Sequence, residues 1–405
     1  MKKFFLVAAV ALCALTISST KEAKSTDYQH YWMKVKASDK FQRSVVANTG
    51  AAIEIVQDDY VIAYGNDLAL AAIKKLGWLQ ASSNLALEPK DFPSADSAYH
   101  NYAELTQALQ TLEKENPDIV KLTSFAKTTE GRDMWVVRIS ADLAHADTKP
   151  AVIYMGGHHA REHLSVELPL MWAQYLVDEY KKQNPRVVSL LQSRDVHIIP
   201  TVNPDGMEYD IKDGAYKMWR KNRKQNADGT YGVDLNRNYG YQWGTGGSSS
   251  NTSSEIYMGP KPFSEVETIA MKDYIEAHTN ITTLLSLHSY SKLVLYPWGY
   301  QYDGVTDTKD HAVLEKMAKT MASWNGYTPE QTSELYIASG DTTDWAYGTH
   351  KIISFTFELD PASSGFGGGF YPGAGVIQPV FQKNLEPFLY LLEYSDNPYR
   401  VLEPM

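Results

Sequence analysis

The sequence has a single cysteine in 405 residues, Cys13, and this residue lies close to the N-terminus. Disulfide bonds therefore cannot hold the rest of the chain together, and the same scarcity excludes a cysteine nucleophile or a cysteine-based metal site there. The chain also lacks a G-x-S-x-G sequence, the turn that presents the nucleophile in many serine hydrolases. Serine and cysteine catalysis are both disfavoured, and stability must come from a hydrophobic core or from bound metal.

Long hydrophobic runs and an excess of positive charge are missing as well. No stretch reaches the roughly 18 consecutive apolar residues that a membrane-spanning helix requires. The formal net charge of −10 argues against nucleic acid or an anionic membrane as the main partner. Hydrophobic residues make up 43% of the chain and charged residues 21%, which is the balance of an ordinary globular protein with a sizeable core.

The N-terminus has the pattern of an export signal. Lys2 and Lys3 precede a short apolar run, residues 4–12, which small and hydroxyl-bearing residues follow. A short basic region before such a run is typical of a secretory signal peptide. We therefore predict a signal peptide over residues 1–24 and a secreted protein, extracellular or periplasmic, without a membrane partner in its mature form. A lipid anchor on Cys13 and a buried N-terminal helix are the alternatives.

The remaining chain divides into two parts of different character. Residues 28–83 alternate apolar and polar positions in three short runs beside one helical stretch. This pattern predicts a small α+β unit. Residues 88–94 are polar and contain two prolines. They fit a linker that a protease can reach, although a loop within one domain has the same composition.

From Tyr99 onward, strand-like and helix-like segments alternate. Helices are expected at residues 164–180 and 266–277, and buried strands at residues 151–155, 196–200, 282–287 and 352–359. Such alternation predicts an α/β fold with a mixed, mostly parallel twisted sheet flanked by helices on both faces. Ligands in these folds bind at the carboxyl ends of the strands, so polar residues at those ends are the candidates for a site.

Three of these strand ends carry metal-binding or acidic side chains. The first strand runs through two glycines into His159 and Glu162, which can present a nitrogen and a carboxylate oxygen from one turn. Another strand ends at His288. Glu358 lies in an otherwise apolar strand, where an ionised carboxylate is costly unless it is paired or near a metal. Each feature alone fits an ordinary buried polar group, whereas together they predict a zinc site with an acid beside it.

Six stretches, in this order, resemble the M14 family of metallocarboxypeptidases, both the pancreatic A/B type and secreted bacterial members such as the carboxypeptidase T-like enzymes. They read GGHHAREH, MWRKNR, GVDLNRN, SLHSYSKLVLYPWGY, YIASGDTTDW and FTFEL. The resemblance spans Tyr99 to about Leu392 and implies a zinc-dependent protease that hydrolyses the C-terminal bond of peptides and proteins. It also implies that the small unit is a ferredoxin-like activation domain. We therefore expect a zymogen with a propeptide over residues 25–90, a catalytic domain over residues 91–405 and an activating protease as a partner.

The resemblance implies a catalytic role for each matching residue. His159, Glu162 and His288 match the ligands of one Zn²⁺ ion per chain, with the fourth position left to water or substrate. Glu358 matches the general base that takes a proton from water and delivers it to the leaving amine. Arg223 matches the arginine that stabilises the oxyanion.

The substrate contacts follow from the same resemblance. Asn236 and Arg237 match the pair that grips the terminal carboxylate, a task to which a planar guanidinium is suited. Tyr336 matches the mobile tyrosine that closes over the substrate. Arg161 and Tyr290 match outer substrate contacts.

The side-chain preference depends on a short loop around residue 340. Family members specific for lysine or arginine carry aspartate at the position of Thr343, and members that favour large apolar residues carry an aliphatic residue there. Here Asp341 lies two residues earlier, as in bacterial members of mixed preference. We expect a pocket that accepts apolar residues and also lysine or arginine paired with Asp341. The alternative is that Asp341 faces solvent or caps a helix.

Other functions use the same residues differently. Residues 159–163 also spell HxxEH, in which His159 and His163 of one helix would bind zinc in an endopeptidase. A peptidase of the same fold that trims cell-wall peptides and a non-catalytic peptide-binding module are further alternatives. A structural Ca²⁺ ion is compatible with the acidic composition, but no ligand set stands out. The family resemblance implies a monomer.

Overall fold

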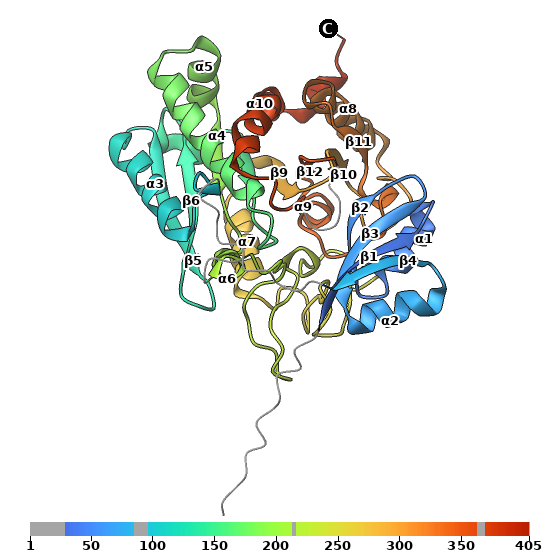
Figure 1. The fold of residues 1–405 in the computed structure, drawn as a ribbon. Coiled ribbons are helices and arrows are strands. Elements are labelled where there is room, and N and C mark those ends of the chain that lie inside the picture. The colour runs from blue at the N-terminus through green and yellow to red at the C-terminus, as the bar shows by residue number, and fades with distance from the viewer. Residues whose placement is uncertain (1–28, 85–95, 213–215, 363–368, 405) are drawn as a thin grey trace, which may run out of the picture.

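The computed structural model describes residues 29–84, 96–212, 216–362 and 369–404, which form two units that lie against each other (Figure 1). The predicted signal peptide, residues 1–24, and the predicted linker, residues 88–94, lie outside these ranges. Within them, no helix combines the length and the apolar character needed to cross a lipid bilayer.

The N-terminal unit is a four-stranded antiparallel sheet with two helices. Its elements are, in order, β1 (His30–Lys36), α1 (Lys40–Ala47), β2 (Ala52–Val56), β3 (Tyr60–Asn66), α2 (Asp67–Leu76) and β4 (Leu79–Asn84). The strands lie side by side in the order β2-β3-β1-β4. This is the ferredoxin-like βαββαβ arrangement, which confirms the prediction for this part of the chain.

The two faces of this small sheet pack against different partners. Met33, Val35 and Val61 belong to the core that the sheet shares with α1 and α2. The opposite face contributes to a second apolar cluster that includes residues of the larger unit. Its members are Trp32, Ile55, Ile62, Tyr64, Met218, Tyr290 and Phe370. The N-terminal unit therefore rests on the larger unit through one face of its sheet, with the helices on the outer side (Figure 1).

The larger unit is built on an eight-stranded mixed sheet. Its strands are β5 (Val120–Lys127), β6 (Asp133–Ile139), β7 (Ala151–Met155), β8 (Asp195–Ile199), β9 (Ile281–Ser289), β10 (Leu293–Tyr296), β11 (Thr328–Gln331) and β12 (Ile353–Leu359). They lie in the order β11-β10-β12-β9-β7-β8-β6-β5. The four strands β12, β9, β7 and β8 are parallel to one another, and β10 on one side and β6 on the other pair with them antiparallel. The predicted mixed, mostly parallel sheet is confirmed.

Helices cover both faces of the large sheet. One apolar core joins the sheet to α3 (Tyr102–Glu115), α4 (Leu164–Lys181), α5 (Pro185–Ser193), α8 (Thr308–Asn325) and α10 (Ile377–Tyr394). A second core, on the opposite face, includes α7 (Val266–Ala277) and α9 (Thr342–His350). A short helix, α6 (Pro204–Asp210), follows β8. The parallel strands are therefore buried on both faces, and the carboxyl ends of β9 and β12 and the turn after β7 border one cavity.

Candidate active site and metal centre

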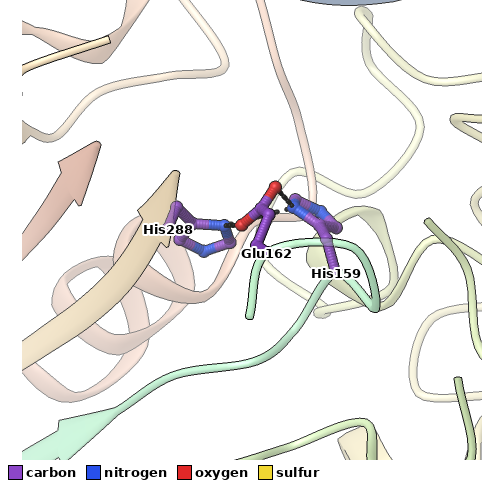
Figure 2. A group of neighbouring side chains, drawn as sticks. All are labelled: His159, Glu162 and His288. Carbon is purple, nitrogen blue, oxygen red and sulfur yellow. Dashed lines mark hydrogen bonds and ion pairs between the residues drawn. The ribbon is translucent and has the colours of Figure 1, made fainter. Parts of the chain in front are cut away.

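Two histidines and one glutamate converge at the carboxyl ends of β7 and β9. His159 Nδ1 lies 2.7 Å from Glu162 Oε1, and His288 Nδ1 lies 3.0 Å from Glu162 Oε2 (Figure 2). The two Nδ1 atoms are 3.2 Å apart, and all three side chains are buried. Two imidazole nitrogens and one carboxylate oxygen are a donor set that catalytic zinc uses, with a further position open for water or substrate. The three residues predicted as zinc ligands therefore meet in a group that fits this metal.

The backbone just after β7 explains how the first two side chains reach the site. A Cβ atom on Gly156 would lie 1.9 Å from the carbonyl oxygen of Ser165, so only glycine allows this close approach. Gly157 has a φ of +62°, which turns the chain sharply out of the strand. His159 and Glu162 then follow in a turn, before α4 begins at Leu164.

This geometry opposes the HxxEH endopeptidase alternative. His163 is the residue that precedes α4, and its Nε2 lies 2.9 Å from Asp210 Oδ2. The metal-binding group contains His159 and Glu162 but not His163. The two histidines of the motif thus point to different surroundings, whereas that alternative needs both on one face of a helix.

Electrostatic effects keep Glu162 ionised as a ligand should be. Burial alone would raise the pKa of Glu162, but the neighbouring His159 and His288 hold it well below the usual value. The outer nitrogens of both histidines have partners of their own, since His159 Nε2 lies 3.1 Å from Asp234 Oδ1 and His288 Nε2 lies 3.1 Å from Ser286 Oγ. Such outer partners fix the ring orientation of metal-binding histidines.

Asp234 is a residue that the sequence analysis missed. It is fully buried and contacts His159 with one oxygen and Arg220 with the other, at 3.0 Å from Arg220 Nη2. Burial would raise its pKa, but Arg220 and His159 hold it far below the usual value. Its position in the GVDLNRN stretch, two residues before the predicted substrate contact Asn236, could have marked it as a site residue.

Glu358 reaches the same cavity from β12. The parallel pairing of β12 with β9 places Glu358 directly beside His288. Burial, together with the negative charge of Glu162, raises the pKa of Glu358 well above its usual value. A cation bound by His159, Glu162 and His288 would oppose this upward shift of the pKa. A carboxyl group beside a metal site is placed to accept and release a proton.

The cavity brings together most of the predicted substrate contacts. Its lining includes His159, Glu162 and Glu358. His288, the third metal-binding residue, contacts the cavity-lining Glu162. Of the other predicted residues the lining includes Asn236, Arg237, Tyr290, Tyr336, Asp341 and Thr343. Arg161 is fully buried beside the cavity, where its guanidinium donates to the carbonyl oxygen of Met218 and lies over the rings of Tyr64 and Phe370.

Arg223 is the exception among the predicted site residues. Its guanidinium lies over the ring of Tyr209, 3.5 Å from the centroid, and also near the rings of Trp219 and Tyr231. Arg220 lines the cavity instead, together with His159 and Glu162. The placement predicted for Arg223 needs correction, because its charge is held among aromatic rings away from the metal-binding group. Both arginines lie in one MWRKNR stretch that forms no helix, so their spacing did not reveal which of them faces the site.

The predicted carboxylate-binding pair lies on a short turn after Asp234. Arg237 is held by the carbonyl oxygens of Gly247 and Asn236, each 2.9 Å from a guanidinium nitrogen. Asn236 Oδ1 accepts from the backbone N–H of Thr342 at 3.0 Å. These contacts fix both side chains in the wall of the cavity.

Asp341 makes two kinds of contact at once. Its Oδ1 accepts from the backbone N–H of Asp344 at 2.8 Å and from the hydroxyl of Thr343 at 2.7 Å, so it caps α9. Its Oδ2 is buried and has no hydrogen-bond partner among the described residues. Burial raises the pKa of Asp341. The expected pocket role and the capping alternative thus involve different oxygens of one carboxyl group.

Comparison with known proteins assigns the chain to a protein family. Residues 105–387, more than half of the chain, match the zinc carboxypeptidase family of M14 peptidases. The chain belongs to this family. It is 33% identical over 400 residues to the zinc carboxypeptidase of Saccharothrix mutabilis subsp. capreolus, a match that covers 91% of this chain and 90% of that one. Carboxypeptidase A2 of Rattus norvegicus is 36% identical over 309 residues, which cover 75% of this chain and 72% of that one.

The solved structures agree on the fold. The carboxypeptidase A from Helicoverpa armigera superimposes with a TM-score of 0.75 at 24% identity, and the match covers 91% of this chain and 98% of that one. The predicted family is confirmed, and the chain is a metallocarboxypeptidase, a peptide hydrolase of the zinc-dependent class. Within the described ranges, no second group of three histidine, cysteine, aspartate or glutamate side chains lies close enough together to hold a metal ion.

Proposed function

We propose that this metallocarboxypeptidase is a secreted exopeptidase that removes single residues from the free C-terminus of peptides and proteins. It is made with a signal peptide over residues 1–24 and a propeptide over residues 25–90, and residues 91–405 form the catalytic domain. The observation that carries the proposal is one cavity whose lining includes His159 and Glu162 of the metal-binding group together with the cationic Arg237. A site that binds a terminal carboxylate beside a metal selects the last peptide bond of a chain.

The chain's own residues divide the work of hydrolysis. His159, Glu162 and His288 would hold the zinc ion, which when bound lowers the pKa of water and polarises a carbonyl group. Glu358 takes the proton of the attacking water and returns it to the nitrogen of the leaving amine. Arg220, rather than Arg223, donates to the oxyanion that forms at the scissile carbonyl.

Substrate placement is assigned to the remaining residues of the cavity. Asn236 and Arg237 bind the terminal carboxylate, with Arg237 as a planar donor. Tyr336 closes over the substrate, and Arg161 and Tyr290 contact residues before the scissile bond. This arrangement fixes the distance between the free C-terminus and the general base Glu358, so internal bonds are not positioned for attack.

The proposal is tested with paired peptides on protein cleaved in the linker over residues 88–94. One peptide has a free C-terminus and the other is amidated, and each is incubated with and without a zinc chelator. Stepwise loss of single residues from the free peptide alone, abolished by the chelator, is the expected result in mass spectrometry. Internal cleavage of both peptides would contradict the exopeptidase assignment.

The zymogen part of the proposal rests on Glu54 of the N-terminal unit. The pairing of β2 with β3 shifts register between Ile53 and Ile55, so Glu54 is the extra residue of a bulge, a feature that often redirects a side chain. Its carboxylate accepts a hydrogen bond from Arg161 and lies 3.9 Å from Arg220 Nη1. An acid of the propeptide thus occupies the cationic part of the cavity.

A second contact surface holds the rim of the cavity. Arg43 of α1 donates to the carbonyl oxygens of Glu334 and Leu335, each at 2.5 Å. The Ser44 hydroxyl accepts from the backbone N–H of Ile337 at 2.8 Å. These bonds flank Tyr336, which also packs against the core of the N-terminal unit. The propeptide therefore restrains the segment that must move for substrate entry.

We expect Glu54→Gln to raise the activity of the uncleaved chain about tenfold, because it removes a charge-assisted hydrogen bond to a buried arginine. The measurement is hydrolysis of a free C-terminal peptide before and after removal of the propeptide. Lys40→Gln is the matched control, since it breaks a 2.6 Å ion pair with the more exposed Glu334 at the edge of the same interface. Equal effects of the two substitutions would contradict a specific blocking role of Glu54.

The substrate preference is proposed to be mixed, apolar and basic. The unpartnered Oδ2 of Asp341 is the group that a lysine or arginine side chain would pair with. We expect Asp341→Asn to lower kcat/KM for a C-terminal lysine at least about tenfold and to change it less than about threefold for leucine. Asparagine keeps the helix cap, so a lost cap does not explain the result. Equal loss with both substrates would contradict the pairing.

A further inference from the structure

His158 is a buried histidine that the mechanism above does not use. It directly precedes His159, and its side chain is fully buried. Its Nε2 lies 2.9 Å from Thr342 Oγ1 and 3.0 Å from the hydroxyl of Tyr239. Its Nδ1 has no hydrogen-bond partner among the described residues. A neutral imidazole carries one N–H, and only the Nε2 side offers an oxygen to accept it.

Thr342 links His158 to Asn236, one member of the proposed carboxylate-binding pair. Its hydroxyl donates to Asn236 Oδ1 at 3.1 Å, and its backbone N–H donates to the same oxygen at 3.0 Å. Because Oδ1 receives both bonds, the amide nitrogen of Asn236 is left as the end that can face a ligand in the cavity. When His158 donates to Thr342 Oγ1, the threonine proton is directed at Asn236.

The opposite side of His158 contacts the metal centre. Its ring stacks on the ring of His288, with centroids 5.4 Å apart and an interplanar angle of 18°. The imidazole therefore lies between a metal-binding residue and the residues that orient Asn236. Among the described residues, the hydrogen-bond contacts of the ring are those of Nε2 with Thr342 and Tyr239.

We propose that His158 is a positioning residue that acts through Thr342 to hold the Asn236 amide in the orientation that binds the terminal carboxylate. This inference rests on the carboxylate-binding role proposed above for Asn236. His158 is not among the residues that line the cavity, so its loss is expected to act on substrate binding and not on the chemical step.

The test compares His158→Leu and Thr342→Val with the wild-type processed enzyme. Both variants keep the volume of the side chain approximately and remove the polar link. We expect each to raise KM for a free C-terminal peptide about threefold to tenfold, the range for one lost buried hydrogen bond, with kcat within about twofold. The dissociation constant of free phenylalanine, measured by calorimetry without turnover, should rise by the same factor. Zinc content should stay at one ion per chain.

Three further variants separate this role from a merely structural one. Thr342→Ser keeps the hydroxyl and should restore KM to within about twofold of wild type. Tyr239→Phe removes the other hydroxyl that His158 contacts and should leave KM nearly unchanged. The double variant of His158→Leu and Thr342→Val should bind no more weakly than the weaker single variant, since both break one link.

An unchanged KM in Thr342→Val, or additive effects in the double variant, would overturn the inference. A loss of zinc with an unchanged phenylalanine affinity would also overturn it, because the role of His158 would then lie at the metal. If His158→Leu fails to fold, the pair Thr342→Val and Thr342→Ser decides alone. Absence of exopeptidase activity in the wild-type enzyme contradicts the proposed function instead, and the calorimetric comparison still tests this inference.

Discussion

Replacing Glu358 with glutamine is expected to lower kcat of the processed enzyme about 10³- to 10⁴-fold, near the upper end of what a general acid–base residue contributes. Glutamine has the same shape but can neither take a proton from water nor return one to the leaving amine. Substrate binding depends on other residues, so KM should change less than about threefold. Steady-state kinetics on a free C-terminal peptide, with zinc content measured in parallel, checks both parts.

The control for this variant is Glu330→Gln, which makes the same substitution on β11, outside the cavity lining. It should retain kcat within about twofold. A Glu358→Gln enzyme with more than about a tenth of the wild-type kcat would contradict the assignment of Glu358 as the base.

The second large effect is expected from Arg220 and not from Arg223. Arg220→Ala removes a fixed cation from the cavity wall and should lower kcat about 10²- to 10³-fold, as the loss of an oxyanion donor does. Arg223→Ala should leave kcat within about threefold, because its guanidinium lies over the rings of Tyr209, Trp219 and Tyr231. The substitution Arg223→Ala should instead lower the Tm, because the lost cation–π contacts contribute about 1–2 kcal/mol to the free energy of unfolding.

Arg220 also pairs with the buried Asp234, so its removal leaves an unpaired carboxylate near His159. Zinc content and Tm of Arg220→Ala must therefore be measured with kcat. Arg220→Lys keeps a charge for Asp234 but loses the planar donor. A large loss of kcat in Arg220→Lys at full zinc content assigns the effect to the oxyanion, whereas a large loss in Arg223→Ala would reverse the assignment.

The sequence was sufficient to predict features that depend on local pattern. Buried strands that end in polar residues are visible as apolar runs, and a parallel sheet brings such ends together. For this reason His159, Glu162, His288 and Glu358 could be placed at one site before the fold was known. The ferredoxin-like unit was also predictable in outline, because alternation and helix signals mark its elements.

Features that depend on side-chain direction in irregular segments were not predictable. Arg220 and Arg223 are three residues apart in a stretch without helix or strand, so no periodicity says which one faces the cavity. Asp234 and His158 act through neighbours distant in sequence. Glu54 reaches the cavity because of a bulge in β2, and a bulge leaves little trace in an alternating pattern.

The pairing of β12 with β9 has a consequence for errors in folding. Phe355, Phe357 and Leu359 point into the helix-covered core, while the residues between them share the face of Glu358 and the cavity. A slip of one residue along β9 would turn every side chain of β12 to the opposite face. Glu358 would enter an apolar layer and the phenylalanines would enter the cavity. The misaligned sheet is therefore less stable than the correct one. The packing of the hydrophobic core thus selects the strand register that places Glu358 beside the metal-binding residues.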